Sequence, residues 1–192
     1  GQVGNELSKI LTQFGEVTAT DKSEMDLSDP SQIRHTISQV HPELIVNAGA
    51  YTAVDRAESE PELAQAVNSI APKILAEEAK KLGIVLIHYS TDYVYGGETQ
   101  NTPYRECDLP APISVYGKTK FEGDQAIKKS GALHLIFRTS WVYSHNGKSF
   151  LRTILQLAKE REVLRVVNDQ IGAPTWCRSI ANGTGKVIKH LL

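Results

Sequence analysis

A tyrosine and a lysine four residues apart, Tyr116 and Lys120, are the side chains whose types and spacing first suggest chemistry. Within a helix they would share one face and reach a common ligand. A tyrosine acting near neutral pH must drop about 3 units from a pKa of about 10, which is roughly 4 kcal/mol. An ammonium about 4 Å away, at an effective dielectric near 20, supplies about that much, although burial opposes it. Such a pair also arises by chance, so its surroundings decide its meaning.

A row of polar side chains ends the strand expected just before this helix. Ser90, Thr91 and Asp92 follow an apolar run, and open α/β sheets bind ligands at the carboxyl ends of their strands. We therefore expect the Thr91 hydroxyl to converge with Tyr116 and Lys120. These three residues are the predicted catalytic set.

The start of the chain resembles part of a dinucleotide-binding fingerprint. Gly1, Gln2, Val3 and Gly4 precede an expected helix, although an ordinary turn would use the same residues. Asp21 ends the next expected strand, near the spacing of about 20 residues at which an acidic side chain binds the adenosine ribose. The sequence supports two roles for Asp21 equally: a contact to the ribose, and a structural role in a turn.

Two further short segments could contact a bound dinucleotide. Ala50, Tyr51 and Thr52 follow small residues at the end of a predicted buried strand, where a flat ring or diphosphate could approach the backbone, although small residues also mark tight packing. Asp26 and Leu27 lie in an earlier loop and could flank an adenine ring. All five are predicted cofactor contacts.

The elements that must position these residues alternate between strand and helix. This alternation predicts an α/β fold, a Rossmann-type doubly wound parallel sheet, in one domain over residues 1–192. Pro72 should kink or restart its helix. The expected strands are 16–20, 44–48, 84–90, 133–138 and 164–168, and the expected helices lie after Gly4 to Gly15, at 31–40, 62–82, 114–129 and 150–160, and after Cys177.

Composition argues against several function classes. The 192 residues have a formal net charge of −1 and no basic run, so neither nucleic acid nor a membrane surface is an expected partner. The two cysteines, Cys107 and Cys177, predict neither a disulfide framework nor a paired-cysteine metal site. No apolar run is long enough for a membrane span and no signal-peptide pattern opens the chain, so a cytoplasmic protein is expected.

Longer strings of residues resemble one particular family. Together with the Tyr116 to Lys120 motif they are similar to the dTDP-4-dehydrorhamnose reductase family of the extended short-chain dehydrogenases/reductases. The resemblance covers the whole chain and is carried by residues 46–55, 56–61, 88–95, 138–143 and 168–175.

The resemblance implies a reaction and roles for the predicted site. NADPH or NADH would reduce the C4 keto group of dTDP-4-dehydro-L-rhamnose to give dTDP-L-rhamnose, in nucleotide-sugar metabolism. Tyr116 would donate the proton, Lys120 would hold the nicotinamide ribose and lower the tyrosine pKa, and Thr91 would bind the carbonyl oxygen. Asp92 and Trp141 would contact the sugar nucleotide, although Trp141 could equally be a core aromatic at a strand end.

The resemblance also shows where this chain departs from the family. Relatives have a strand and a first glycine before Gly1 and a further substrate-binding segment after Leu192, so the chain is expected to be a fragment truncated at both ends and inactive as it stands. Some members bind Mg²⁺ between subunits through acidic residues such as Glu6. A second such position is Arg178 here, so no metal is predicted. The sequence leaves open whether NADH or NADPH is preferred and whether the protein forms a homodimer.

Other readings of the same scaffold remain. A sugar-nucleotide 4,6-dehydratase would need a glutamate where Tyr93 stands, and an epimerase would need no net hydride transfer. A non-catalytic relative could keep the fold as a dinucleotide-binding regulatory subunit. The presence of Tyr116, Lys120 and Thr91 favours the reductase.

Overall fold

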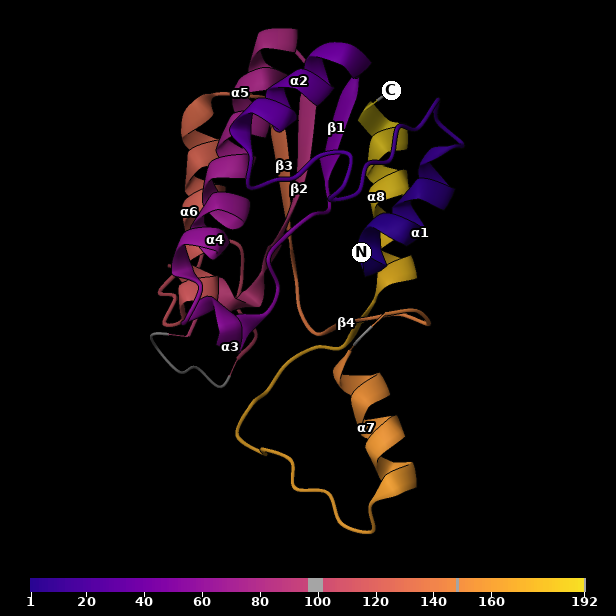
Figure 1. Ribbon diagram of the computed structural model, residues 1–192, viewed down its shortest axis with the longest axis vertical. Coiled ribbons are helices and arrows are strands. Elements are labelled where there is room, and N and C mark those ends of the chain that lie inside the picture. The colour runs from indigo at the N-terminus through magenta and orange to yellow at the C-terminus, as the bar shows by residue number, and fades with distance from the viewer. Residues whose placement is uncertain (97–101, 148, 192) are drawn as a thin grey trace. The chain divides into compact units, whose positions relative to one another are not determined.

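The protein is described by a computed structural model covering residues 1–96, 102–147 and 149–191. The chain divides into two compact units. One contains residues 20–138, and the other contains residues 1–19 together with 139–192. The arrangement of elements within each unit is shown in Figure 1.

The unit of residues 20–138 is built on a three-stranded sheet with the order β1-β2-β3. These strands are β1 (Leu44–Asn47), β2 (Val85–Thr91) and β3 (His134–Thr139). β1 and β2 are parallel, with Asn47 opposite His88 at the last paired position. The carboxyl ends of β1 and β2 therefore lie side by side, as ligand binding by an open α/β sheet requires.

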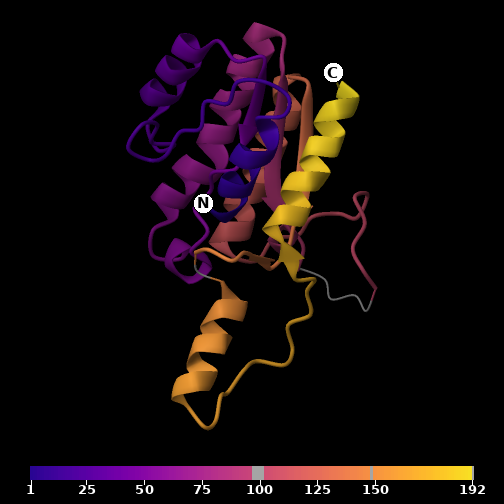
Figure 2. The same ribbon diagram turned by 90° about the vertical axis from the view of Figure 1, so that its right-hand side faces the viewer.

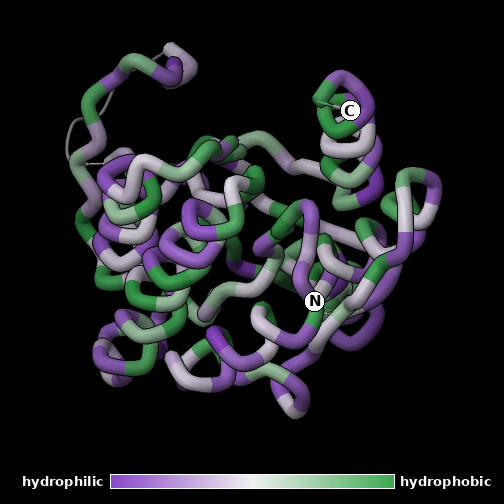
Figure 3. Tube along the Cα trace, turned by 90° about the horizontal axis from the view of Figure 1, so that it is seen from above, coloured by the Kyte–Doolittle hydropathy of each residue, from purple (hydrophilic) through white to green (hydrophobic). Residues whose placement is uncertain are grey.

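Three helices cover one face of this sheet (Figures 1 and 2): α2 (Pro30–Val40), α5 (Ala71–Leu82) and α6 (Val115–Ser130). Asp29 caps the start of α2 by accepting from the amides of Ser31 and Gln32. Left-handed glycines end the other two helices. Apolar and polar residues alternate along the chain (Figure 3), and buried apolar side chains from these helices and from β2 form one core, among them Ile33, Ile74, Leu75, Leu86 and Ile127.

The restart expected at Pro72 takes the form of a π-helical segment. α4 (Pro61–Gln65) continues into η1 (Ala66–Ile70), and α5 follows with Pro72 in its first turn. Proline cannot donate to the carbonyl four residues earlier, which is that of Asn68. A Cβ added at Gly123 of α6 would lie 2.2 Å from that carbonyl oxygen. The π segment and α6 therefore meet backbone against backbone.

Two short helices complete this unit beside the sheet edge. They are α3 (Val54–Ala57), after β1, and the 3₁₀ turn η2 (Asp92–Val94), directly after β2. The Thr91 hydroxyl caps η2 by accepting from the Tyr93 amide. Thr91 is thereby fixed at the junction of strand and turn.

The other unit contains α1 (Gln2–Leu11), α7 (Phe150–Glu160) and α8 (Cys177–Leu191), with a two-stranded parallel sheet of β4 (Val142–Tyr143) and β5 (Thr175–Trp176). α1 and α8 pack against each other, and a Cβ at Gly185 would lie 2.9 Å from Ile10. Among the described residues of both units, no helix is long and apolar enough to cross a membrane.

The structure overturns two of the expected strands. Residues 16–20 and 164–168 are irregular and mostly exposed. A strand exists only where a neighbour completes its backbone hydrogen bonds, and β-branched composition cannot supply that neighbour. The two-residue strands β4 and β5 were missed because so short a pattern gives no periodicity. The first helix also ends at Leu11, before Gly15.

Replacing Gly123 with alanine should destabilise the protein, because the added methyl group would collide with the Asn68 carbonyl. The expected loss is about 1–3 kcal/mol in the free energy of unfolding. Gly183 is the matched control. It also lies inside a helix, but a Cβ there meets nothing within 4 Å. Gly183→Ala should therefore be neutral or stabilising by up to about 1 kcal/mol. Equal effects of the two substitutions in denaturant unfolding would contradict the close approach.

Candidate active site

Tyr116, Lys120 and Thr91 come together in the unit of residues 20–138. Tyr116 and Lys120 are one turn apart on the same face of α6 and are 9% and 1% exposed, while Thr91 ends β2 and is 5% exposed. The Thr91 side chain lies near the Tyr116 hydroxyl and acts to lower the pKa of Tyr116. Ser114 caps the start of α6 by accepting from the Gly117 amide at 3.1 Å. A Cβ at Gly117 would lie 2.3 Å from the Tyr93 carbonyl oxygen, so only glycine lets η2 approach α6 here.

The Tyr116 hydroxyl is held in its protonated form. Burial raises the pKa of Tyr116 to about 12, and the neighbouring Asp92 adds to the rise. The Thr91 side chain acts in the opposite direction. The Tyr93 ring packs edge-on against the Tyr116 ring with centroids 5.5 Å apart. Near neutral pH Tyr116 is therefore a proton donor rather than a phenolate.

Lys120 points toward β2. Its Nζ donates to the Tyr89 carbonyl oxygen at 2.6 Å and lies 3.2 Å from His88 Nε2. Burial lowers the pKa of Lys120 to about 8, while Asp124 acts to raise it. The sequence argument expected Lys120 to lower the pKa of Tyr116. The net shift of the Tyr116 pKa is upward, because burial of the phenol outweighs its neighbours, and the effect expected of Lys120 stays a prediction.

A buried polar cluster behind Lys120 was missed by the sequence analysis. Asp124 is fully buried and accepts from the Ser90 hydroxyl at 2.7 Å. Arg138 Nε lies 3.9 Å from its carboxylate, and burial raises the pKa of Asp124. Asp124 stands one helical turn beyond Lys120. The spacing 116, 120, 124 is therefore a signal that could have identified it.

Asn68 holds the loop after β1 in place and was also missed. Its side chain accepts from the Tyr51 amide at 2.9 Å and donates to the Tyr51 carbonyl oxygen at 3.0 Å. The same amide group contacts the Thr119 hydroxyl at 3.3 Å. The Tyr51 ring packs with Tyr116, Ala57 and other residues in one apolar cluster. Of the predicted cofactor contacts in this loop, Tyr51 thus packs on the apolar cluster that contains Tyr116.

The adjacent small residues form a tight contact. A Cβ at Gly49 would lie 2.5 Å from the Leu27 side chain, so the glycine makes room for Leu27 beneath the loop. Leu27 in turn packs on the hydrophobic core. Ala50 is half-buried and Thr52 is exposed. This contact brings Leu27 together with the loop that contains Ala50.

Asp21 and Asp26 both stabilise their own turns. Asp21 Oδ1 accepts from the Ser23 amide and hydroxyl at 2.7 and 2.6 Å. Asp26 Oδ1 accepts from the amide and hydroxyl of Ser28 at 2.8 and 2.7 Å. These hydrogen bonds lower the pKa of each carboxyl. The turn role considered for Asp21 is therefore observed, and its ribose contact stays a prediction.

The remaining predicted residues lie in the unit of residues 1–19 and 139–192. Gly1 caps α1 without a side chain, and Gln2, Val3 and Gly4 form its first turn. Trp141 has a left-handed backbone with φ of 44°. Its ring lies 5.7 Å from that of Phe150, and it is 37% exposed rather than a core aromatic.

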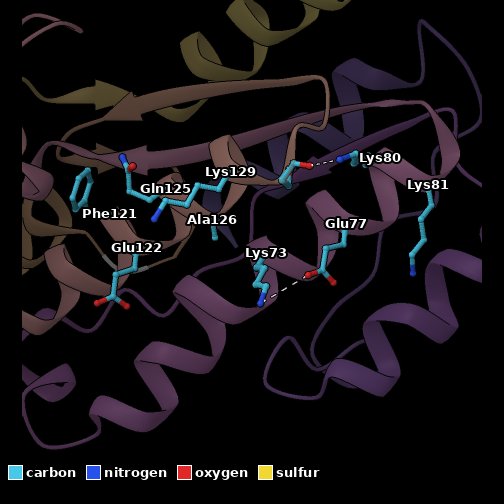
Figure 4. A pocket seen from close by; sticks show the side chains of 10 residues that line it. Lys73, Glu77, Lys80, Lys81, Phe121, Glu122, Gln125, Ala126 and Lys129 are labelled. Carbon is cyan, nitrogen blue, oxygen red and sulfur yellow. Dashed lines mark hydrogen bonds and ion pairs between the residues drawn. The ribbon is translucent and has the colours of Figure 1, made fainter.

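A separate groove of about 770 Å³ lies between α5 and α6 (Figure 4). Its lining includes Lys73, Glu77, Phe121 and Lys129, and none of the predicted site residues. Lys73 pairs with Glu77 across 4.0 Å. The groove therefore lies on the outer faces of these helices. Tyr116 and Lys120 are on a different face of α6.

The metal position suggested by the resemblance contains an ion pair. Arg178 Nε lies 3.1 Å from Glu6 Oε2, and Lys9 also bonds Glu6. These two cations lower the pKa of Glu6. In the part of the chain that the structure describes, no three His, Cys, Asp or Glu side chains are grouped to hold a metal ion.

Comparison with known proteins places this geometry in a family. Residues 1–192 match the family described as the RmlD substrate binding domain. The chain belongs to this family. It is 47% identical over 196 residues to a dTDP-4-dehydrorhamnose reductase of Escherichia coli K12, covering 100% of this chain and 65% of the relative. The corresponding enzyme of Burkholderia thailandensis is 46% identical, with 98% and 63% covered.

A solved structure of the family confirms the Rossmann-type α/β fold. The dTDP-4-dehydrorhamnose reductase of Bacillus anthracis in complex with NADP superposes with a TM-score of 0.91 at 36% identity, covering 98% of this chain and 67% of that one. The chain thus spans about two thirds of the length of its family relatives. The fold prediction and the family resemblance are confirmed.

Replacing Thr91 with valine should raise the pKa of Tyr116 further, because a hydrogen bond that stabilises the phenolate is lost while the volume is kept. The measurement is the alkaline rise of tyrosinate absorbance, taken as the difference between each protein and its Tyr116→Phe counterpart. The parent difference curve should have its midpoint near 12. A midpoint that falls in Thr91→Val would contradict the assigned hydrogen bond.

Proposed function

We propose that the protein to which this chain belongs is an NAD(P)H-dependent reductase of the C4 keto group of dTDP-4-dehydro-L-rhamnose, forming dTDP-L-rhamnose. The observation that supports it best is a buried tyrosine, Tyr116, whose raised pKa keeps it protonated and which lies beside the hydroxyl of Thr91 at the end of β2. A ketone that gains a hydride needs one proton on its oxygen and a donor to stabilise the developing charge. Tyr116 and Thr91 are suited to these two tasks.

The proposed role of each side chain follows from its surroundings. Tyr116 donates its proton to the carbonyl oxygen, since its raised pKa keeps the proton available at neutral pH. Thr91 donates a hydrogen bond to the same oxygen as negative charge develops. Lys120, on the same helical face, binds the hydroxyls of the nicotinamide ribose and places the ring beside the ketone.

The residues present fit a dinucleotide cofactor, NADPH or NADH. Gly1 leaves the first-turn amides of α1 without a side-chain cap, and such amides bind phosphate. Gly49 packs closely on Leu27 and has no side chain, so a flat ring can approach the backbone of the loop after β1. When bound, the cofactor supplies a hydride. The residues proposed to hold it are Gly1, Gln2, Val3, Gly4, Asp21, Asp26, Leu27, Ala50, Tyr51, Thr52, Tyr116 and Lys120.

Asp92 and Trp141 are the proposed contacts to the sugar nucleotide, together with Thr91. Asp92 is half-buried and accepts from the Thr91 hydroxyl at 3.2 Å, so the Thr91 proton would have to turn from Asp92 to the carbonyl oxygen when substrate binds. Trp141 is a bulky residue with positive φ, a conformation that persists only where the surroundings enforce it and that clusters at ligand sites. The homodimer considered from the sequence stays a prediction.

The competing activities have less support. A dehydratase would place an acidic side chain where Tyr93 stands, and here the Tyr93 ring is packed edge-on against Tyr116. A regulatory dinucleotide-binding subunit would not need a protonated tyrosine beside Thr91. That arrangement favours the reductase over both.

The test is NADPH or NADH oxidation by the full-length protein with dTDP-4-dehydro-L-rhamnose. Tyr116→Phe should lower kcat by about 10²–10⁴-fold, the usual contribution of a general acid, while cofactor affinity changes little. Tyr104→Phe is the matched control, because Tyr104 is 39% exposed and stacks on Tyr95, a contact that phenylalanine keeps.

The outcomes separate the alternatives. A parent protein that binds dinucleotide but turns over no ketone would favour the regulatory subunit. Turnover unchanged in Tyr116→Phe would remove the proposed acid.

A further inference from the structure

The start of α6 has one backbone amide that a side chain from another element satisfies. The first amides of a helix have no carbonyl partner within it. The Ser114 hydroxyl accepts from the Gly117 amide at 3.1 Å, and regular helical bonding begins with the Lys118 amide. The Val115 amide donates instead to Glu58 Oε1 at 2.8 Å. Glu58 lies 57 residues earlier in the chain, at the end of α3.

The first turn of α6 cannot supply such a carboxylate itself. Many helices have a glutamate at the third helical position, and its side chain reaches back to a free amide at the helix start. In α6 that position is Gly117, where a Cβ would lie 2.3 Å from the Tyr93 carbonyl oxygen. The whole first turn has no acidic residue. Because η2 approaches α6 at this glycine, the carboxylate has to come from another element.

α3 also holds the loop after β1. The Tyr51 hydroxyl donates to Glu60 Oε2 at 2.5 Å, and Glu60 Oε1 accepts from Arg56 at 2.5 Å. The Glu60 amide bonds the Arg56 carbonyl oxygen at 2.9 Å, so this carboxylate is fixed to α3. Ala57 of α3 is fully buried in the apolar cluster that contains Tyr116. α3 is therefore bonded to the loop on one side and to the start of α6 on the other.

We propose that Glu58 is a positioning residue for Tyr116. Val115 directly precedes Tyr116, so the bond from its amide to Glu58 fixes the first turn of α6 relative to α3. α3 also binds Tyr51 through Glu60. One short helix thereby holds both the loop of proposed cofactor contacts and the proposed proton donor, and Glu58 sets the position of the donor relative to that loop.

The catalytic meaning of this role rests on the proposed reductase. Hydride and proton must reach adjacent atoms of one carbonyl group, and a displacement of about 1 Å can lower a rate by about 10²-fold. Tyr116 is the second residue of α6, within the turn that Glu58 and Ser114 cap. Fraying of that turn would move the phenol before it affected Lys120, which lies one turn further along the helix.

Two substitutions of Glu58 separate its hydrogen bond from its charge. Glu58→Ala removes the acceptor, whereas Glu58→Gln keeps an acceptor oxygen of the same reach and loses the charge. Glu62→Ala is the matched control. Glu62 is also exposed and places a carboxylate in the first turn of a helix, but that helix is α4. All variants are made in the full-length protein.

Amide hydrogen exchange tests the bond itself without cofactor or substrate. Glu58→Ala should speed the exchange of the Val115 amide by about 10-fold or more, the effect of losing one hydrogen bond to a charged group. Glu58→Gln should keep most of the protection, and Glu62→Ala should keep all of it. A Val115 amide that exchanges equally fast in the parent and in Glu58→Ala would overturn the proposal.

The alkaline titration of Tyr116 tests whether the bond positions the phenol, again as the difference from the Tyr116→Phe counterpart of each variant. Burial sets the parent midpoint at about 12. Glu58→Ala should lower it by about half a pH unit or more, toward the value of about 10 of an exposed tyrosine. Glu58→Gln loses the same charge but should stay near the parent midpoint.

Two titration results contradict a positioning role. Equal midpoints in the parent and in Glu58→Ala would make Glu58 a cap that only stabilises the helix. Equal falls in Glu58→Ala and Glu58→Gln would assign the effect to charge alone.

Turnover provides the last test. Glu58→Ala should lower kcat by about 10-fold and leave the KM for the dinucleotide within about 2-fold, because the proton donor moves while the cofactor loop stays bonded to Glu60. Glu58→Gln and Glu62→Ala should keep kcat within about 2-fold of the parent. An unchanged kcat in Glu58→Ala would overturn the proposal. Exchange and titration need no turnover, so the expected results in a protein without reductase activity would refute only the proposed function.

Discussion

The burial of one amine, Lys120 Nζ, against the backbone of β2 is the constraint on which the rest of the site depends. An amine 1% exposed must have its hydrogen bonds completed by the protein, and the Tyr89 carbonyl oxygen and His88 complete them. That requirement fixes the register of α6 along β2. Once the register is set, Tyr116 reaches Thr91 and Asp124 reaches Ser90 without further adjustment.

The close fit of α6 to its neighbours maintains this register. Gly117 lets the turn after β2 approach one end of the helix, and Gly123 lets the π segment approach its middle. Helices that meet backbone against backbone cannot slide without losing contact over the whole interface. Close packing at these two glycines therefore holds α6 in the register that the hydrogen bonds of Lys120 require.

The sequence could predict those parts of the protein that depend on local pattern. The strands β1 and β2, the helix containing Tyr116 and Lys120, and the convergence with Thr91 follow from periodicity and from the parallel topology. Residues 16–20 show the limit of that reasoning, because a strand depends on a partner that the segment itself does not encode. The upward direction of the Tyr116 pKa could not be read from the sequence for a similar reason, since burial is a property of the whole fold.

The π-helical segment has a consequence for how this family can vary. It inserts one extra residue into the turn before α5, and it contains Asn68, which holds the loop after β1. A single-residue deletion there would restore regular α-helix and leave the flanking turns close to their present orientation, because a π turn takes up about one residue more than an α turn. The change would fall on the segment itself, which contains Asn68 and its hydrogen bonds to Tyr51. Insertions and deletions should thus be tolerated in the surface loops of this domain long before they are tolerated between residues 66 and 70.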